Sequence, residues 1–127
     1  TALQPGGFII QNIKGHSPVT SVHNIVNLED GEVISATSSH HQMMYPFNVE
    51  NHKIIAISET ALSTKYEVGA EHKFGKYSTN LKAVKQEPEI VFYEKSKALC
   101  IQGHPEWLDK SARYAEYCRN LIKDLLL

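Results

Sequence analysis

The sequence predicts an α/β fold in a single domain that spans residues 1–127. Short apolar runs separated by Gly, Pro and Asp-Gly breaks indicate a series of β-strands. The last part of the chain has the residue spacing of an amphipathic helix. With 127 residues and 42% hydrophobic content, the chain can bury one sizeable core and is too short for two.

The first third of the chain predicts a connector and then two strands joined by a tight turn. Residues 8–13 form a short apolar stretch between two breaks that contain Pro and Gly, which indicates a connector. Residues 19–28 alternate as a strand does, and Glu29-Asp30-Gly31 ends this strand, since Asp-Gly commonly joins two β-runs. A second strand over residues 32–37 leads into the polar loop 38–42, and ligands of open α/β sheets bind beyond strand ends of this kind.

The rest of the chain predicts more strands, a surface insertion and a final helix. Apolar runs indicate strands at residues 53–58, 89–93 and 98–102, the last two joined by a turn at 95–97. Residues 61–87 carry Lys, Tyr, Glu and Gly without a clear period, which predicts a surface insertion. Residues 109–127 predict an amphipathic helix with Asp109 as its N-cap. Its expected apolar face consists of Ala112, Ala115, Cys118, Ile122 and Leu125.

Composition bounds the partners and the setting. Thirteen basic and fourteen acidic residues give a formal charge of −1, which predicts neither nucleic acid nor an anionic membrane as a partner. Two cysteines without CxxC spacing predict neither a disulfide framework nor a zinc ribbon, and they favour a reducing, cytoplasmic setting. No apolar run approaches the roughly 18 residues of a membrane span, and no signal-peptide pattern opens the chain. The opening at Thr1 indicates a piece of something longer.

The pattern His104-Pro105-Glu106 follows the last predicted strand. An extended Pro dipeptide places residues two apart on the same side, so Glu106 can hold the His104 imidazole. A carboxylate on one ring nitrogen fixes the tautomer and stabilises the imidazolium that forms when the other nitrogen takes a proton from a nucleophile. The pattern therefore predicts two members of a triad, and the alternative is a strand end whose His and Glu face solvent.

Neither cysteine of the chain is expected to be the nucleophile. Cys100 precedes His104 by four residues on one strand, which separates their Cα atoms by about 13 Å. Cys118 lies on the apolar face of the predicted helix, where a buried thiol behaves as a small hydrophobe. Both are therefore predicted to be structural.

A second polar cluster is Ser38-Ser39-His40-His41-Gln42. Adjacent histidines raise the possibility of a metal site, because imidazole is a common ligand. No third ligand with recognisable spacing lies near them. We therefore predict a polar loop that lines a pocket, with no metal and no other cofactor.

Three segments, in order, resemble the class I glutamine amidotransferase family. The run from Leu99 to Glu106 resembles the strand and Gln-x-His-Pro-Glu motif that close the domain of this family. Ser39-His40-His41-Gln42 is similar to a segment of the γ-glutamyl hydrolase-like branch. Gly6-Gly7 through Gln11, with Gly15-His16, is similar to the stretch that follows the nucleophile helix. The resemblance covers most of the chain apart from residues 61–87.

The resemblance implies the C-terminal portion of a three-layer α/β/α domain with a Cys-His-Glu triad. His104 would be the general base and Glu106 its orienting carboxylate, while Ser39, His41 and Gln42 would line the pocket for glutamine or a γ-glutamyl substrate. The cysteine would lie on a strand-to-helix elbow a few residues before Thr1, on a missing N-terminal half or a companion chain. The chain alone would then be inactive.

The resemblance leaves the reaction partner open. The parent protein would be either a hydrolase of a small γ-glutamyl compound or an amidotransferase that passes ammonia to a synthetase partner, and the His-His-Gln segment favours the hydrolase. The alternative from another class is a non-catalytic domain that keeps this fold for binding or assembly. The acceptor and the oligomeric state do not follow from the sequence.

Overall fold

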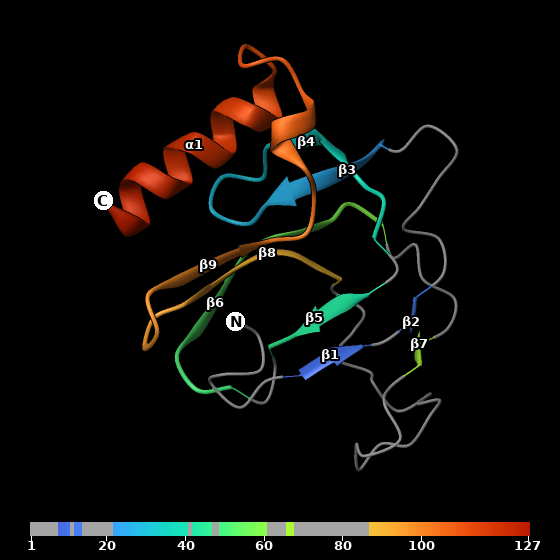
Figure 1. Cartoon of the computed structure of the whole chain (residues 1–127), viewed down its shortest axis with the longest axis vertical. Helices are drawn as coiled ribbons and strands as arrows, with labels where there is room; N and C mark the ends of the chain where they lie inside the picture. Colours follow the sequence, from blue (N-terminus) through green and yellow to red (C-terminus); the bar gives the residue numbers. More distant parts are fainter. Residues whose placement is uncertain are drawn as a thin grey trace.

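The computed structural model describes residues 8–10, 12–13, 22–40, 42–46, 49–60, 66–67 and 87–127. Within these ranges the fold is mostly β (Figure 1). Five strands form one sheet in the order β4-β3-β6-β8-β9, and every pair of neighbours is antiparallel. The strands are β3 (Val22–Asn27), β4 (Val33–Thr37), β6 (His52–Ser58), β8 (Pro88–Tyr93) and β9 (Ala98–Ile101). The sheet curls into a half-barrel.

Two short strand pairs lie beside this sheet. β1 (Phe8–Ile10) pairs with β5 (Met43–Tyr45), and β2 (Asn12–Ile13) pairs with β7 (Tyr66–Glu67), both antiparallel. The prediction of a connector over residues 8–13 is therefore wrong where β1 and β2 occur. Of the predicted surface insertion 61–87, the structure describes only β7 and the buried Glu87, and the rest lies outside the described residues.

The two predicted turns make hairpins, as their sequences indicated. After β3 the chain reverses at residues 28–30, where the Gly31 amide donates to the Asn27 carbonyl at 2.8 Å. Gly31 has φ +76°, a left-handed conformation that suits glycine. The second turn joins β8 to β9 over residues 94–97. In these two hairpins, β3–β4 and β8–β9, the strands are antiparallel because the connection is too short for a crossover.

The C-terminal helix α1 (Arg113–Leu126) packs on one face of the sheet, against β4 and β9 (Figure 1). Tyr114, Tyr117 and Cys118 of α1 enter a core with residues of β3, β4, β6 and β8, among them Ile25 and Phe92. A second, smaller core contains the buried side chains of Met44, Val49, Val91 and Tyr93. No helix within the described ranges is long and apolar enough to cross a bilayer.

The helix begins later than the sequence predicted. Its N-cap is Ala112, which provides no side-chain cap, so the prediction of Asp109 as the N-cap is wrong. Asp109 Oδ1 instead accepts hydrogen bonds from the backbone N–H and the hydroxyl of Ser111, at 2.8 and 2.6 Å. This local turn competes with the first turn of a helix. The buried face is also shifted toward the tyrosines, and Ile122 is exposed.

The prediction of a three-layer α/β/α domain is wrong. Parallel strands need a crossover of a dozen or more residues, usually a helix, and the two hairpins here leave no room for one. The three-layer arrangement was implied by the family resemblance, whereas the apolar runs indicated only strands. β8 is indeed buried at all six positions, but α1 covers one side and residues of β5 and its neighbours cover the other. A near-continuous apolar run thus reports burial on two faces, not the direction of the neighbouring strand.

Candidate functional site

His104 and Glu106 form a contact at the end of β9. His104 Nδ1 lies 2.8 Å from Glu106 Oε1, so the ring donates its Nδ1 proton to the carboxylate. The His104 side chain is 37% exposed and that of Glu106 is 64% exposed. The Nδ1 bond leaves Nε2 as the basic nitrogen, and it has no recorded partner among the described residues. A neutral imidazole held in this way can accept a proton from a nucleophile at Nε2.

The pair arises from a helical turn and not from an extended dipeptide as predicted. His104 precedes the short 3₁₀-helix η2 (Pro105–Trp107), with φ −117° and ψ 78°. Proline restricts the residue before it and suits the first position of a helix, so the chain turns directly after His104. Glu106, at the second position of this turn, reaches back to the ring. The pairing was predicted correctly, while the backbone that creates it was not.

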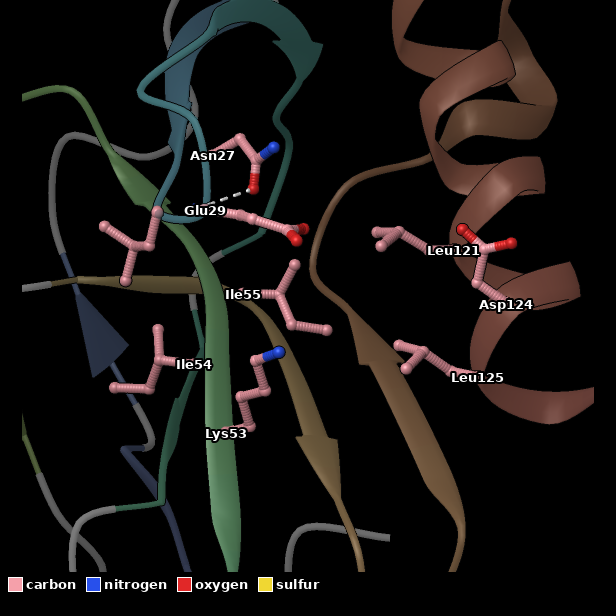
Figure 2. A pocket seen from close by; sticks show the side chains of 9 residues that line it. Asn27, Glu29, Lys53, Ile54, Ile55, Leu121, Asp124 and Leu125 are labelled. Atoms are coloured by element: carbon pink, nitrogen blue, oxygen red, sulfur yellow. Dashed lines mark hydrogen bonds between the residues drawn. The ribbon is translucent and has the colours of Figure 1, made fainter.

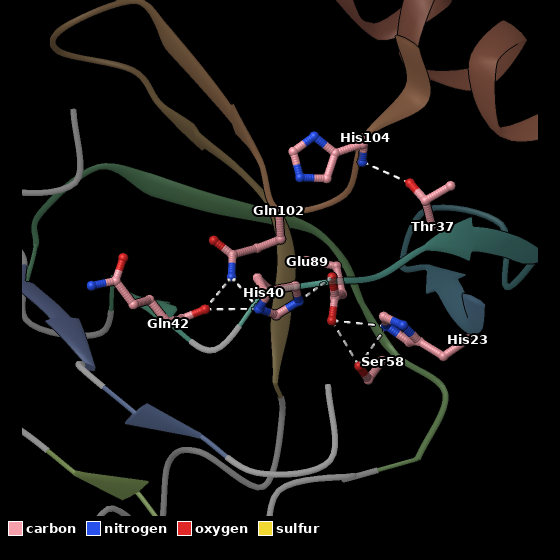
Figure 3. A network of polar contacts seen from close by, with 8 residues as sticks. All are labelled: His23, Thr37, His40, Gln42, Ser58, Glu89, Gln102 and His104. Atoms are coloured by element: carbon pink, nitrogen blue, oxygen red, sulfur yellow. Dashed lines mark hydrogen bonds and ion pairs between the residues drawn. The ribbon is translucent and has the colours of Figure 1, made fainter. Parts of the chain in front are cut away.

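Two contacts fix the backbone beneath the His104 ring. The His104 amide donates to the buried Thr37 hydroxyl at 2.7 Å (Figure 3). Gly103 is buried against Tyr114 and the Thr37 carbonyl, so closely that a Cβ would lie 2.5 Å from Tyr114 Oη and 2.6 Å from Thr37 O. Only glycine fits there. The end of β4 and the start of α1 thereby set the position of His104.

Trp107 covers one face of the imidazole. The two rings are stacked, with centroids 3.9 Å apart and planes 8° from parallel. Trp107 is itself 58% exposed, so the ring packs on His104 and not into the core. Stacking and the Glu106 bond together limit the rotation of the imidazole.

The His104 bond lowers the pKa of Glu106 below its ordinary value of 4.5, with a smaller contribution from its own backbone amide. A carboxyl whose pKa is lowered by folding stabilises the folded state. This stabilisation is fully present at pH values above the ordinary pKa and is lost as the pH falls through the lowered pKa. We expect the Glu106 carboxyl resonance to titrate with a midpoint below 4.5, and to return toward 4.5 in His104→Ala. Carboxyl ¹³C NMR measures both, and equal midpoints in the two proteins would contradict the contact.

The two cysteines are free thiols in packed surroundings. Cys118 is buried in the main core, and burial raises its pKa to about 11, which keeps it in the unreactive thiol form. Cys100 pairs with Val91 across β8 and β9 and packs against the smaller core. The prediction that both are structural agrees with these positions.

Two of the three predicted substrate-binding residues, Ser39 and Gln42, lie in the loop after β4. Ser39 is half-buried, and the Gln42 side chain is exposed. His41 lies outside the described residues. The Gln42 carbonyl accepts hydrogen bonds from His40 Nδ1 at 2.7 Å and from Gln102 Nε2 at 2.9 Å (Figure 3). Gln102 therefore links this loop to the strand end that continues into His104, two residues later.

Several residues at this site were not assigned a role from the sequence. Thr37 and Gln102 tie β4 and the 38–42 loop to the end of β9, and Trp107 stacks on His104. The buried carboxylate of Glu89 lies behind the same loop. An acidic residue within the apolar run of β8 was the one sequence signal, because a buried carboxylate requires partners.

Two grooves lined by described residues lie beside the core. One, of about 360 Å³, lies between β6 and α1, where Figure 2 shows Leu121 and Leu125 across from Ile55, with Lys53, Glu29 and Asp124 around them. The other, of about 370 Å³, reaches Glu106 and is lined by apolar side chains of η2 and α1 together with Lys110 and Arg119. Of these two grooves, the second includes Glu106 in its lining. Among the described residues, no group of three or more His, Cys, Asp or Glu side chains is arranged to hold a metal ion.

Comparison with protein-family models, with curated proteins and with solved structures finds no match for this chain. The resemblance to the class I glutamine amidotransferase family therefore rests on the residues that carry it and stays a prediction.

Proposed function

We propose that this chain supplies the general base and its orienting carboxylate for thiol-dependent cleavage of a γ-glutamyl amide. The observation that carries the proposal is the contact of 2.8 Å between His104 Nδ1 and Glu106 Oε1, which leaves Nε2 available at the surface. This is the arrangement that a base needs when it activates a thiol. The nucleophilic cysteine comes from a segment or companion chain outside residues 1–127.

In the proposed reaction, Nε2 of His104 takes the proton of the cysteine thiol, and the thiolate attacks the γ-carbonyl of the substrate. The imidazolium then returns its proton to the leaving ammonia or amine, which leaves a γ-glutamyl thioester. Water, activated by the same nitrogen, hydrolyses the thioester to glutamate and free thiol. Glu106 stabilises the imidazolium in both steps.

The surroundings of the pair support a small substrate. The groove beside Glu106 has a volume of about 370 Å³, within the range of small-molecule sites. Lys110 and Arg119 line it and supply positive charge for the carboxylate of a γ-glutamyl compound. Hydrolysis of a small γ-glutamyl compound is favoured over ammonia transfer to a synthetase by the His-His-Gln segment of the sequence.

The test uses the complete protein, meaning this chain together with the part that carries the cysteine. Release of p-nitroaniline from γ-glutamyl p-nitroanilide and of ammonia from glutamine would be measured for the wild type, Glu106→Gln and Glu106→Ala. Because Glu106 is largely exposed, we expect losses of only roughly five- to tenfold in kcat, larger for the alanine variant. Gln retains an acceptor for the Nδ1 proton, whereas alanine does not.

Glu94 provides the matched control, because it is an exposed carboxylate in the turn between β8 and β9. Glu94→Gln is expected to keep wild-type turnover. Turnover of neither substrate by the wild-type protein would instead favour the non-catalytic alternative, in which the domain serves binding or assembly. Full turnover in Glu106→Ala would remove Glu106 from the proposed mechanism.

A further inference from the structure

Glu89 is a buried carboxylate that contacts three segments of the chain (Figure 3). It is 2% exposed, and its Oε1 accepts a hydrogen bond from the Ser58 hydroxyl of β6 at 2.9 Å. The same oxygen lies 2.9 Å from His23 Nε2 of β3. Its other oxygen, Oε2, lies 3.6 Å from His40 Nε2 in the loop after β4. A carboxylate in such a place is stable only when cationic or polar donors surround it.

The contacts of His40 determine where its ring protons lie. Nδ1 is 2.7 Å from the Gln42 carbonyl, and a carbonyl oxygen only accepts, so Nδ1 carries a proton. Nε2 is buried and faces a carboxylate oxygen, which also only accepts. Two lone pairs would face each other in a buried place unless a proton lies on Nε2 or on the carboxyl oxygen. With the proton on Nε2, the ring is an imidazolium beside the Glu89 carboxylate.

Gln102 completes the connection. Its Nε2 lies 3.0 Å from His40 Nδ1 and 2.9 Å from the Gln42 carbonyl. Because Nδ1 already carries a proton, the Gln102 amide donates to the carbonyl. The Gln102 backbone amide donates to the Glu89 carbonyl at 2.9 Å, directly after the last residue of β9, which pairs with β8. The loop is thus attached at His40 and at Gln42 to the two strands that lead to His104.

We infer that Glu89 and His40 form a buried ion pair that positions the loop after β4, at residues 38–40 and 42, against the end of β9. Glu89 is a positioning residue in this role, because it acts on the loop through His40. That the positioned loop binds the γ-glutamyl substrate rests on the proposed function, whereas the ion pair itself does not.

Other titratable groups also face this cluster. His23 contacts Glu89 from β3, and Glu87, directly before β8, is also buried. Tyr114 approaches from α1, and its pKa is raised mainly by burial and also by the charge of Glu89. A neutral Tyr114 adds no negative charge of its own, and among the described residues the imidazoles of His23 and His40 lie next to the carboxylate.

The first test is the ¹⁵N NMR spectrum of the imidazole rings in the chain at pH 7. We expect two ring protons on His40 in the wild type and one in Glu89→Gln, with the His104 signals unchanged. Ser58→Ala is the matched control, since it removes a neutral donor to Glu89 and leaves the pair with His40. The wild-type spectrum is decisive even when Glu89→Gln folds poorly: a His40 ring with a single proton overturns the ion pair.

The second test measures kinetics of γ-glutamyl p-nitroanilide cleavage by the complete protein. Loss of loop positioning in Glu89→Gln is expected to raise KM about tenfold with kcat within about twofold, the signature of lost binding. His40→Gln is expected to have the same effect, and the double variant no more than either single one. An active protein whose KM is unchanged in Glu89→Gln overturns the positioning role. A wild type without turnover overturns the proposed function and leaves the NMR result to judge the ion pair.

Discussion

Replacing His104 with alanine is expected to lower the turnover of γ-glutamyl p-nitroanilide by the complete protein about 10²- to 10⁴-fold, the contribution of a positioned general base. The ring has one nitrogen bound to Glu106 and the other available, so its removal takes away the acceptor for the thiol proton. The same loss is expected for glutaminase activity, because both reactions pass through a γ-glutamyl thioester.

The His104→Ala protein is expected to fold. The side chain is 37% exposed and its backbone amide still donates to Thr37, so the substitution leaves the core intact. His52→Ala is the matched control, since His52 lies at the start of β6 and takes no part in the proposed reaction. Thermal unfolding and kcat would be measured together. Wild-type kcat in a folded His104→Ala protein would contradict the role of His104.

Replacing Gly103 with alanine is expected to destabilise the fold by about 1–3 kcal/mol, the usual cost of an added methyl group in a packed place. The new Cβ would lie 2.6 Å from the Thr37 carbonyl, a backbone atom that cannot move away without displacing the end of β4. It would also lie 2.5 Å from Tyr114 Oη at the buried start of α1. Urea unfolding measures the loss.

Gly31→Ala separates this clash from the general cost of replacing a glycine. Gly31 has open space around its missing Cβ but a φ of +76°, so alanine is strained there by roughly 1–2 kcal/mol. Both variants are expected to unfold at lower urea concentrations than the wild type. Only Gly103→Ala is expected to shift the His104 ring signals, because only Gly103 adjoins His104. Unchanged His104 signals in Gly103→Ala would show that the backbone contact does not position the ring.

The sequence predicted the elements of this fold better than their arrangement. The strands near residues 32–37, 53–58, 89–93 and 98–102 and the final helix all occur with small changes at their ends. Their direction was wrong, although the Asp30-Gly31 turn and the turn at 95–97 already indicated antiparallel hairpins. The parallel arrangement came from the family resemblance and not from the apolar runs, because burial on both faces leaves the same apolar pattern whichever element provides the cover.

At the candidate site, too, the sequence predicted the local contact but not the long-range ones. The His104–Glu106 contact is local, two residues apart, and a short pattern was enough to predict it. The contacts that hold it are long-range: Thr37 lies 67 positions from His104, and His23 lies 66 positions from Glu89. No local period encodes such pairs. They follow only from the register of β3, β4, β8 and β9, which the predicted parallel sheet did not provide.

The most direct test of the proposed acid–base pair is the intact mass of the complete protein, quenched in acid during turnover of γ-glutamyl p-nitroanilide. A thiol reaction served by His104 predicts a γ-glutamyl group bound to a cysteine outside residues 1–127, and a much slower formation of this adduct when His104 is alanine. Continued hydrolysis without any adduct, or an adduct that forms at the wild-type rate in His104→Ala, would contradict the account.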